Sequence, residues 1–260
     1  MNIEIKRDYY LEQLISRMDN GLIKVVTGIR RCGKSYLLRT LFKKYLLEQG
    51  VSEDHIIEMA FDLYDNIEFR DPKVFYPWVK EQLKDGEKYF ILLDEVQMLD
   101  EFVSVLNGLA DKKNCDVFVT GSNAKFLSRD IATEFGGRGD EIHMYPLSFS
   151  EFMSVYDGHY YDGWNEYITY GGIPIVVLAD TDEQKMALLD NLFKETYIRD
   201  IASRNKVRNV GEMETLLNIL SSAIGSLTNP NKLQKTFKSV NQSKITATTI
   251  TKYIEYLEDS

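Results

Sequence analysis

The segment Gly28–Ser35 reads GIRRCGKS and matches the pattern G-x-x-x-x-G-K-[ST] of a phosphate-binding loop. Glycine permits an unusual backbone path, on which consecutive N–H groups can point at a phosphate. In such a loop we expect Lys34 to reach the β- and γ-phosphate oxygens and the Ser35 hydroxyl to bind Mg²⁺. The alternative is an ordinary glycine-rich turn with a solvated lysine. The apolar run before the motif and the amphipathic pattern after it favour the phosphate loop.

The variable positions of this loop carry two arginines and a cysteine. Arg30 and Arg31 could contact phosphate or a partner, but solvated charges explain them at least as well. Cys32 would lie beside the phosphates, where no chemistry requires a thiol. The loop residues expected to contact a nucleotide are Gly28, Ile29, Arg30, Arg31, Cys32, Gly33, Lys34, Ser35 and Tyr36.

Two acidic residues, Asp94 and Glu95, follow the apolar run Tyr89–Leu93. A carboxylate at the end of a core strand is costly to bury unless something compensates it, and Mg²⁺ would do so. Asp94 is therefore the candidate metal ligand, acting through water. Glu95 is the candidate base that orients or deprotonates an attacking water. The alternative is a strand that simply exits to solvent, which the phosphate loop upstream disfavours.

A further apolar run, Val117–Thr120, leads into Gly121, Ser122 and Asn123. Ser122 or Asn123 could lie beside the γ-phosphate and the attacking water. Serine and asparagine also cap helices often, so helix capping explains these residues equally well.

Apolar runs alternate with helical patterns up to Pro146. The expected strands are Lys24–Thr27, Ile56–Phe61, Tyr89–Leu93, Val117–Thr120 and Ile142–Tyr145. The expected helices lie near Ser35–Glu48, Pro72–Leu83 and Glu101–Ala110. This alternation predicts an α/β fold in which helices cover both faces of a parallel sheet. Ligands of parallel sheets bind at the carboxyl ends of the strands, where both candidate motifs fall.

Beyond Pro146 the pattern becomes helical. Helices are expected near Ser148–Val155, Trp164–Tyr170, Gln184–Ser203 and Glu212–Ile224, with a turn-rich connector at Asp157–Gly163. Two short helical patterns, Lys232–Lys238 and Thr246–Leu257, flank the polar turn Ser239–Ser243 and outline a helix-turn-helix.

The composition is that of a globular protein with an acidic balance. The 260 residues are 44% hydrophobic and carry a net charge of -9, which counts against non-specific nucleic-acid binding by the whole chain. The 2 cysteines form no disulfide framework. The N-terminus lacks the apolar core of a signal peptide, and no apolar run is long enough to span a membrane. We therefore expect a cytoplasmic protein without membrane contact.

Taken together and in this order, the motifs resemble the archaeal-type ATPase family of the AAA+ superfamily, which is related to the signal-transduction ATPases with numerous domains. The segments that carry the resemblance are Thr27–Ser35, Leu93–Gln97, Thr120–Asn123, Gly137–Arg138, Tyr145–Phe152 and Tyr197–Ile201. Gly172-Ile173-Pro174 also matches a Gly-x-Pro motif in the helical lid of the related ATPases. The resemblance implies a P-loop NTPase fold of AAA+ type, with ATP and Mg²⁺ as ligands.

The resemblance implies roles for individual residues. Asn123, or Ser122 beside it, would be the polar sensor of the γ-phosphate. Arg138 falls where such ATPases carry an arginine that senses the γ-phosphate of its own or a neighbouring subunit; a mobile glycine-rich loop is the alternative. Pro174 would contact adenine from the lid, or would simply start a helix. The implied catalytic set is Lys34, Glu95, Asn123 and Arg138, and the metal set is Ser35 and Asp94.

The resemblance also implies three domains: an ATPase core at 1–147, a helical lid at 148–208 and a winged-helix-like segment at 209–260. A winged helix needs a β-hairpin after its third helix, so we expect the last segment to be truncated. The leading hypothesis is an ATP-hydrolysing switch or remodelling module, with a homo-oligomer and an unknown protein as candidate partners.

The competing hypothesis is a DNA-binding regulator in which ATP is mainly a structural ligand. The acidic charge disfavours it, but a modest basic edge supports it, formed by Lys232, Lys235, Lys238 and Lys244. A P-loop kinase is the third option. It is disfavoured because Asp94 and Glu95 point to a positioned water rather than to an acceptor hydroxyl.

Overall fold

Two units make up the chain in the computed structural model, which describes residues 4–121, 135–241 and 245–258. The contacts divide the chain into Met1–Asp180 and Thr181–Ser260. The first unit holds a parallel sheet with the helices that cover it, and the second is helical. The division into core, lid and winged-helix-like segment stays a prediction. Its boundaries, after residues 147 and 208, differ from the boundary between the two units, which follows Asp180.

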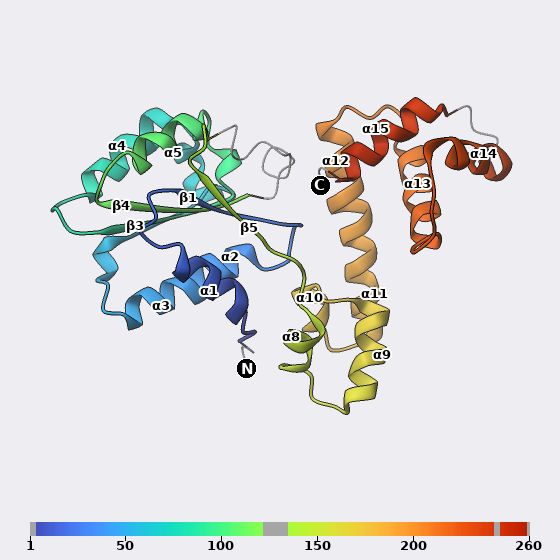
Figure 1. Ribbon diagram of the computed structural model, residues 1–260, viewed down its shortest axis with the longest axis horizontal. Helices are drawn as coiled ribbons and strands as arrows, with labels where there is room; N and C mark the ends of the chain where they lie inside the picture. Colours follow the sequence, from blue (N-terminus) through green and yellow to red (C-terminus); the bar gives the residue numbers. More distant parts are fainter. Residues whose placement is uncertain (1–3, 122–134, 242–244, 259–260) are drawn as a thin grey trace. The chain divides into compact units, whose positions relative to one another are not determined.

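A five-stranded parallel sheet forms the centre of the first unit, in the order β2-β3-β4-β1-β5 (Figure 1). The strands are β1 (Ile23–Thr27), β2 (Ile56–Ala60), β3 (Tyr89–Asp94), β4 (Cys115–Thr120) and β5 (Gly139–His143). The predicted parallel sheet is confirmed, but β5 begins at Gly139, before the apolar run that predicted it. Because β5 is an edge strand and pairs only with β1, its polar residues Asp140 and Glu141 can remain in contact with water.

Helices cover both faces of this sheet, as predicted (Figure 1). One layer consists of α4 (Pro72–Gln82) and α5 (Phe102–Ala110). The other consists of α1 (Asp8–Ser16) and a helix that runs through α2 (Lys34–Tyr36), the wider turns of Leu37–Phe42 and α3 (Lys43–Glu48). Side chains alternate between the two faces along each strand, so Val25 packs with Phe75 in the first layer and Val26 packs with Leu38 in the second.

Helix α1 is an element that the sequence analysis did not predict. Its buried residues, Tyr10 and Leu14, lie one helical turn apart and pack against the sheet. The chain also forms short 3₁₀ turns at Glu53–His55, Tyr64–Arg70 and Val96–Met98.

Three short helices follow β5 in the first unit: α8 (Phe149–Met153), α9 (Tyr160–Tyr170) and α10 (Pro174–Val177). The predicted connector Asp157–Gly163 is therefore wrong in its second half, which belongs to α9. Gly163 is buried within the helix, where an added Cβ would lie 2.5 Å from the Met153 sulfur. This glycine permits close packing of α9 and is not a turn residue.

The described residues of the second unit form α11 (Asp182–Asn191), wider turns over Leu192–Ile198, α12 (Arg199–Arg204), α13 (Val210–Ser222), α14 (Pro230–Asn241) and α15 (Ala247–Glu258). Its core includes Met213, Leu216, Leu233, Phe237, Ile250 and Tyr253, which join α13, α14 and α15. The predicted helix-turn-helix corresponds to α14 and α15, although α14 extends into the predicted turn. Within the described residues, no helix offers the long apolar stretch that a membrane span needs.

Candidate nucleotide-binding site

The phosphate-loop motif connects the carboxyl end of β1 to the amino end of α2. Gly28 has a φ of 132°, and an added Cβ would lie 2.1 Å from the carbonyl oxygen of Met144. Gly33 has a φ of 103° and precedes the first helical residue. Because only glycine adopts such angles readily, these two residues allow the loop to turn over the end of β1 and present the amino end of α2.

The side chain of Lys34 lies inside this loop. It is 4% exposed, and its Nζ donates hydrogen bonds of 2.9 Å to the carbonyl oxygens of Gly28 and Ile29. The ammonium group is therefore held by the loop itself and faces the space that a phosphate would occupy. Arg30 and Arg31 are exposed at the loop surface.

Asp94, the last residue of β3, is buried beside the loop. Its Oδ1 accepts hydrogen bonds from Ser35 Oγ at 2.9 Å and from Thr120 Oγ1 at 2.5 Å. Burial raises the pKa of the Asp94 carboxyl, and the two hydroxyl donors only partly oppose this effect. In the described part of the chain, no basic side chain forms an ion pair with it. Carboxylate and hydroxyl oxygens are ligands that Mg²⁺ prefers, so Ser35 and Asp94 fit a magnesium ion.

Glu95 follows Asp94 in a left-handed conformation, with a φ of 53°. This backbone is strained for a residue with a side chain, and such strain is common at functional sites. The Glu95 N–H donates to Thr120 Oγ1 at 3.0 Å, and its carboxylate accepts a hydrogen bond from Gln97 Nε2. Thr120 thus fixes both acids, a role that the sequence analysis missed. The available signal was a polar side chain at the end of the strand next to β3.

A pocket of about 510 Å³ opens above the loop. It is lined by residues of the phosphate loop and the helix after it, by Glu95, and by a group that includes several apolar side chains: Arg31, Cys32, Gly33, Lys34, Ser35, Tyr36, Glu95, Ile5, Arg7, Leu147, Pro174, Ile175 and Leu178. Gly172 brings α10 close, because an added Cβ would lie 2.1 Å from the Leu147 carbonyl oxygen. Pro174 starts α10 and also lines the pocket, while its contact with adenine stays a prediction. The sequence pattern gave no signal for Ile5 and Arg7, which precede the motif.

The model of a family described as an AAA domain matches residues 20–153, just over half of the chain. The chain belongs to this AAA domain family. A second family model, described as a domain of unknown function, matches residues 161–260 of the AAA protein. The family and the parallel sheet with its phosphate loop agree with the resemblance to archaeal-type AAA+ ATPases.

Two curated relatives of this AAA protein are longer than the chain. An uncharacterized protein of Haemophilus influenzae is 35% identical over 262 residues, which span 98% of this chain and 65% of that protein. An uncharacterized protein of Methanocaldococcus jannaschii is 27% identical over 254 residues, which span 92% of this chain and 55% of that protein. The chain thus covers less than two thirds of either relative.

Two solved structures are similar to this AAA protein over nearly its whole length. AMPPCP-bound DnaA from Aquifex aeolicus has a TM-score of 0.47 and 13% identity, covering 100% of this chain and 89% of that chain. Aeropyrum pernix ORC1 in complex with DNA has a TM-score of 0.43 and 12% identity, covering 99% and 84%. Likeness at this level carries no argument about activity.

Arg138, a member of the implied catalytic set, is not among the described residues that line the pocket of this AAA domain. Arg138 precedes β5, and its carbonyl oxygen accepts a hydrogen bond of 2.8 Å from Ile23 N. It therefore lies at the amino edge of the sheet, opposite to the phosphate loop, and its guanidinium lies 3.7 Å from Asp111 Oδ1. Asn123, and Ser122 beside it, fall outside the described residues.

Proposed function

We propose that this AAA domain binds ATP with Mg²⁺, hydrolyses it, and uses the nucleotide state to switch its conformation. The proposal depends on the buried carboxylate of Asp94, 2.9 Å from Ser35 Oγ. Hydroxyl groups alone leave its charge uncompensated, as the raised pKa of Asp94 indicates. Among the described residues this carboxylate has no ion-pair partner, and a divalent cation that arrives with a triphosphate would supply one.

Glu95 is the proposed base for hydrolysis. It accepts a proton from a water molecule while the water oxygen bonds to the γ-phosphorus and the bond to the bridging oxygen of the ADP leaving group breaks. Gln97 Nε2 orients the Glu95 carboxylate by a hydrogen bond. Lys34 balances the negative charge of the phosphates, and Mg²⁺, when bound, neutralises their oxygens further.

The apolar side chains that line the pocket support adenine as the base. Ile5, Leu147 and Ile175 offer flat apolar contact to a purine ring. Guanine would bury N–H donors that call for a carboxylate acceptor, and an unpaired buried donor costs about 1–3 kcal/mol. Among the described residues that line the pocket, Glu95 is the one carboxylate, and it lies at the phosphate end.

Arg138 is proposed to act on the nucleotide of a neighbouring copy. A strand of the length of β1 spans about 16 Å, so an arginine at the amino edge is too far from the phosphate loop of its own chain. We expect Arg138→Ala to bind ATP normally and to lose hydrolysis. Mixing it with Lys34→Ala should restore activity, because the second variant supplies Arg138 to a subunit that binds ATP. Mixtures as inactive as the separate variants would contradict action between subunits.

The experiment that tests the proposed function is a titration of the chain with ATP and with GTP, with and without Mg²⁺, alongside phosphate release. We expect tighter binding of ATP and Mg²⁺-dependent release of phosphate. The Lys34→Ala variant is the matched control and should bind neither nucleotide. Equal binding of parent and variant would contradict the role of the loop.

A second candidate function is DNA binding by the second unit. Three lysines of α14, namely Lys232, Lys235 and Lys238, are exposed and lie at near-helical spacing. Lys244, the fourth lysine of the predicted basic edge, falls outside the described residues. If the three lysines of α14 contact phosphates, duplex DNA should bind with an affinity that falls steeply as salt rises. A triple glutamine variant at these positions should lose that binding and keep ATP hydrolysis; salt-independent retention of DNA by the variant would contradict the assignment.

A further inference from the structure

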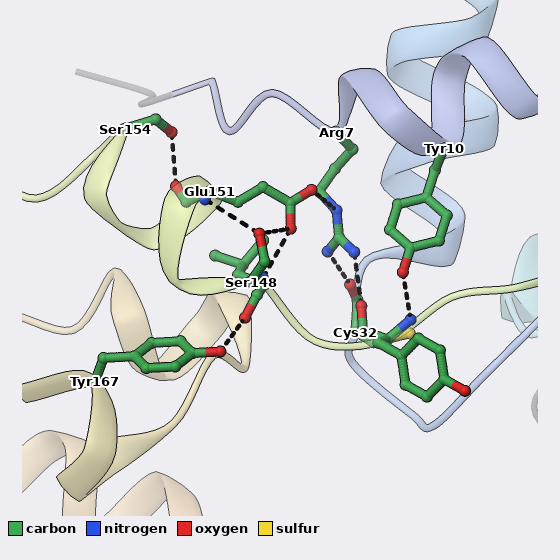
Figure 2. A network of polar contacts seen from close by, with 9 residues as sticks. Arg7, Tyr10, Cys32, Ser148, Glu151, Ser154 and Tyr167 are labelled. Atoms are coloured by element: carbon green, nitrogen blue, oxygen red, sulfur yellow. Dashed lines mark hydrogen bonds and ion pairs between the residues drawn. The ribbon is translucent and has the colours of Figure 1, made fainter. Parts of the chain in front are cut away.

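A buried arginine outside the motifs contacts both the phosphate loop and the helix α8. Arg7 precedes α1, is 2% exposed and lines the nucleotide pocket. Its guanidinium donates hydrogen bonds to the carbonyl oxygens of Cys32, at 3.1 Å, and Tyr145, at 2.6 Å. Figure 2 shows the contact with Cys32. Its Nε lies 2.9 Å from Glu151 Oε1, at ion-pair distance. One side chain thus joins the loop, the connection after β5, and α8.

The contact with Cys32 bears on phosphate binding through the peptide bond. A trans peptide is planar, so the Cys32 carbonyl and the Gly33 N–H point in opposite directions. Holding the carbonyl on Arg7 therefore fixes the direction of the Gly33 N–H, one of the donors of the loop. The positive guanidinium also polarises the peptide, which strengthens that N–H as a donor. Arg7 can thus act on a phosphate that it does not touch.

The contact with Glu151 bears on the start of α8. The second carboxylate oxygen of Glu151 accepts hydrogen bonds from Ser148 N at 2.8 Å and Ser148 Oγ at 2.9 Å, and the Ser148 side chain accepts from the Glu151 N–H in return. This capping box fixes the first turn of α8. One carboxylate therefore caps the helix and balances the charge of Arg7, as Figure 2 shows.

The connection between β5 and α8 is held by the same network. Tyr145 N donates to Tyr10 Oη at 3.0 Å, while its carbonyl oxygen accepts from Arg7. Arg7 also lies 4.7 Å above the Tyr10 ring, a favourable cation–π contact. Both polar groups of the Tyr145 backbone are thus fixed by the N-terminal segment, and any shift of Arg7 is passed on to the connection.

We propose that Arg7 is a positioning residue that couples occupation of the phosphate loop to the position of α8 through Glu151. The inference rests on the proposed nucleotide binding. Lys34 now binds the carbonyl oxygens of Gly28 and Ile29, and a phosphate that draws its ammonium away releases both carbonyls. The loop backbone then readjusts, and the rigid fork of Arg7 carries the change to Glu151.

Coupling of this kind is reciprocal. If nucleotide alters the contact between Arg7 and Glu151, then loss of that contact alters nucleotide affinity by the same factor. Glu151 is not among the described residues that line the nucleotide pocket; it lines a separate groove together with Lys6 and Ser154. A purely structural ion pair would change stability and leave the affinity for nucleotide unchanged.

The test is equilibrium binding of Mg²⁺·ATP to the full chain by calorimetry. Glu151→Gln keeps an acceptor for the helix cap and removes the charge, and we expect affinity to fall roughly 5- to 10-fold. Arg7→Met should lose at least as much, and the double variant no more than Arg7→Met alone. Arg7→Lys should fall between Arg7→Met and the parent. Arg17→Met is the control, because it removes an ion pair of equal length, 2.9 Å to Asp140, outside the pocket.

A second readout follows α8 directly. Trp78→Phe leaves Trp164 as the remaining one of the 2 tryptophans, and its ring lies 5.0 Å from that of Phe149 in α8. ATP should change Trp164 emission, and Arg7→Met should abolish the change at saturating ATP.

Three results would overturn the inference: affinity of Glu151→Gln within twofold of the parent, additive losses in the double variant, or Trp164 emission that ATP leaves unchanged. A parent that binds no ATP contradicts the proposed function as well. A parent that binds ATP while Glu151→Gln binds equally well contradicts the inference alone.

Discussion

An aspartate is buried at each end of the parallel strands, at what we call the amino edge and the carboxyl edge of the sheet. The charges of the two aspartates are compensated differently. At the amino edge, Asp116 forms an ion pair with Lys24, which is fully buried. Lys24 Nζ also donates to the Leu22 carbonyl oxygen at 2.7 Å and lies 4.6 Å above the Phe118 ring. At the carboxyl edge, the hydrogen-bond donors to Asp94 among the described residues are the hydroxyls of Ser35 and Thr120.

This difference shows at which end of the sheet the buried charges are balanced without a ligand. Burial lowers the pKa of Lys24, but the neighbouring Asp116 opposes this effect, so the pair balances its charges within the protein. Around Asp94 the nearby charges are those of Glu95 and Asp62, which add to the raised pKa. The amino edge therefore balances its buried charge with its own ion pair, whereas Asp94 has no ion-pair partner among the described residues, and a bound cation would provide one.

The largest effect, a loss of ATP turnover, should come from replacing Glu95 at the carboxyl edge. Glu95→Gln keeps the shape of the side chain and loses the base, so we expect turnover to fall about 10²- to 10⁴-fold while ATP affinity stays near that of the parent. Phosphate release and calorimetric binding measure the two quantities separately. Glu101→Gln, an exposed acid nearby in the sequence, is the matched control and should hydrolyse ATP normally. Full turnover of Glu95→Gln would remove Glu95 from its role.

At the amino edge, removal of a charged side chain should lower the stability of the fold and leave nucleotide binding unchanged. Lys24→Met leaves Asp116 buried with the Asp19 N–H, at 2.9 Å, as a remaining donor. We expect the free energy of unfolding to fall by about 3–5 kcal/mol, with ATP affinity of the folded chain unchanged. Urea unfolding measures the first quantity. The double variant Lys24→Met, Asp116→Leu is the control and should recover most of the loss; a single variant as stable as the parent would contradict the comparison.

The carboxyl edge was largely predictable because its chemistry is local in the sequence. The spacing of Gly28–Ser35, and two acids after an apolar run, place Lys34, Ser35, Asp94 and Glu95 without knowledge of any long-range contact. The strands were predictable for the same reason, since apolar runs set them. The start of β5 was missed because an edge strand tolerates polar residues, and α1 was missed because the analysis weighed this segment only as a leader sequence.

Residues that act through distant contacts left no such signal. Arg7 meets Cys32, Tyr145 and Glu151 only in the folded chain, and no spacing pattern joins them. Lys24 was the first residue of one predicted strand and Asp116 lay just before another, and the two meet only through the pairing of β1 with β4. The location of Arg138 at the amino edge likewise follows from the pairing of β5 with β1 and not from its motif.

Replacing Asp94 should raise the free energy of unfolding, by less than Lys24→Met lowers it. The raised pKa means that the folded chain holds the Asp94 proton more tightly than the unfolded chain does, so the ionised form opposes folding. Asp94→Asn keeps the acceptor oxygen and removes the charge. Without Mg²⁺ we expect it to be more stable than the parent by about 0.5–2 kcal/mol at pH 8. This gain should vanish as pH falls toward about 4, the ordinary pKa of aspartate.

Thermal melts of parent and variant across this pH range measure the difference. Mg²⁺·ATP should then stabilise the parent and have little effect on Asp94→Asn, since the variant lacks the metal ligand. An asparagine variant that is less stable than the parent at pH 8 would show that the carboxyl edge is as well balanced as the amino edge.

The smallest effect should come from Thr120, which holds both acids before a metal binds. Thr120→Val removes the donor to Asp94 Oδ1 and the acceptor of the Glu95 N–H. We expect a loss of about 0.5–1.5 kcal/mol in unfolding free energy, together with a further rise in the pKa of Asp94, because this hydroxyl lowers it. The pH at which the stability gain of Asp94→Asn reaches its full size follows the pKa of Asp94 in the folded chain, so it should move upward in the Thr120→Val background. Thr120→Ser keeps the hydroxyl and should leave that pH unchanged; if serine and valine behave alike, the hydroxyl does not hold the Asp94 charge and Ser35 alone does so.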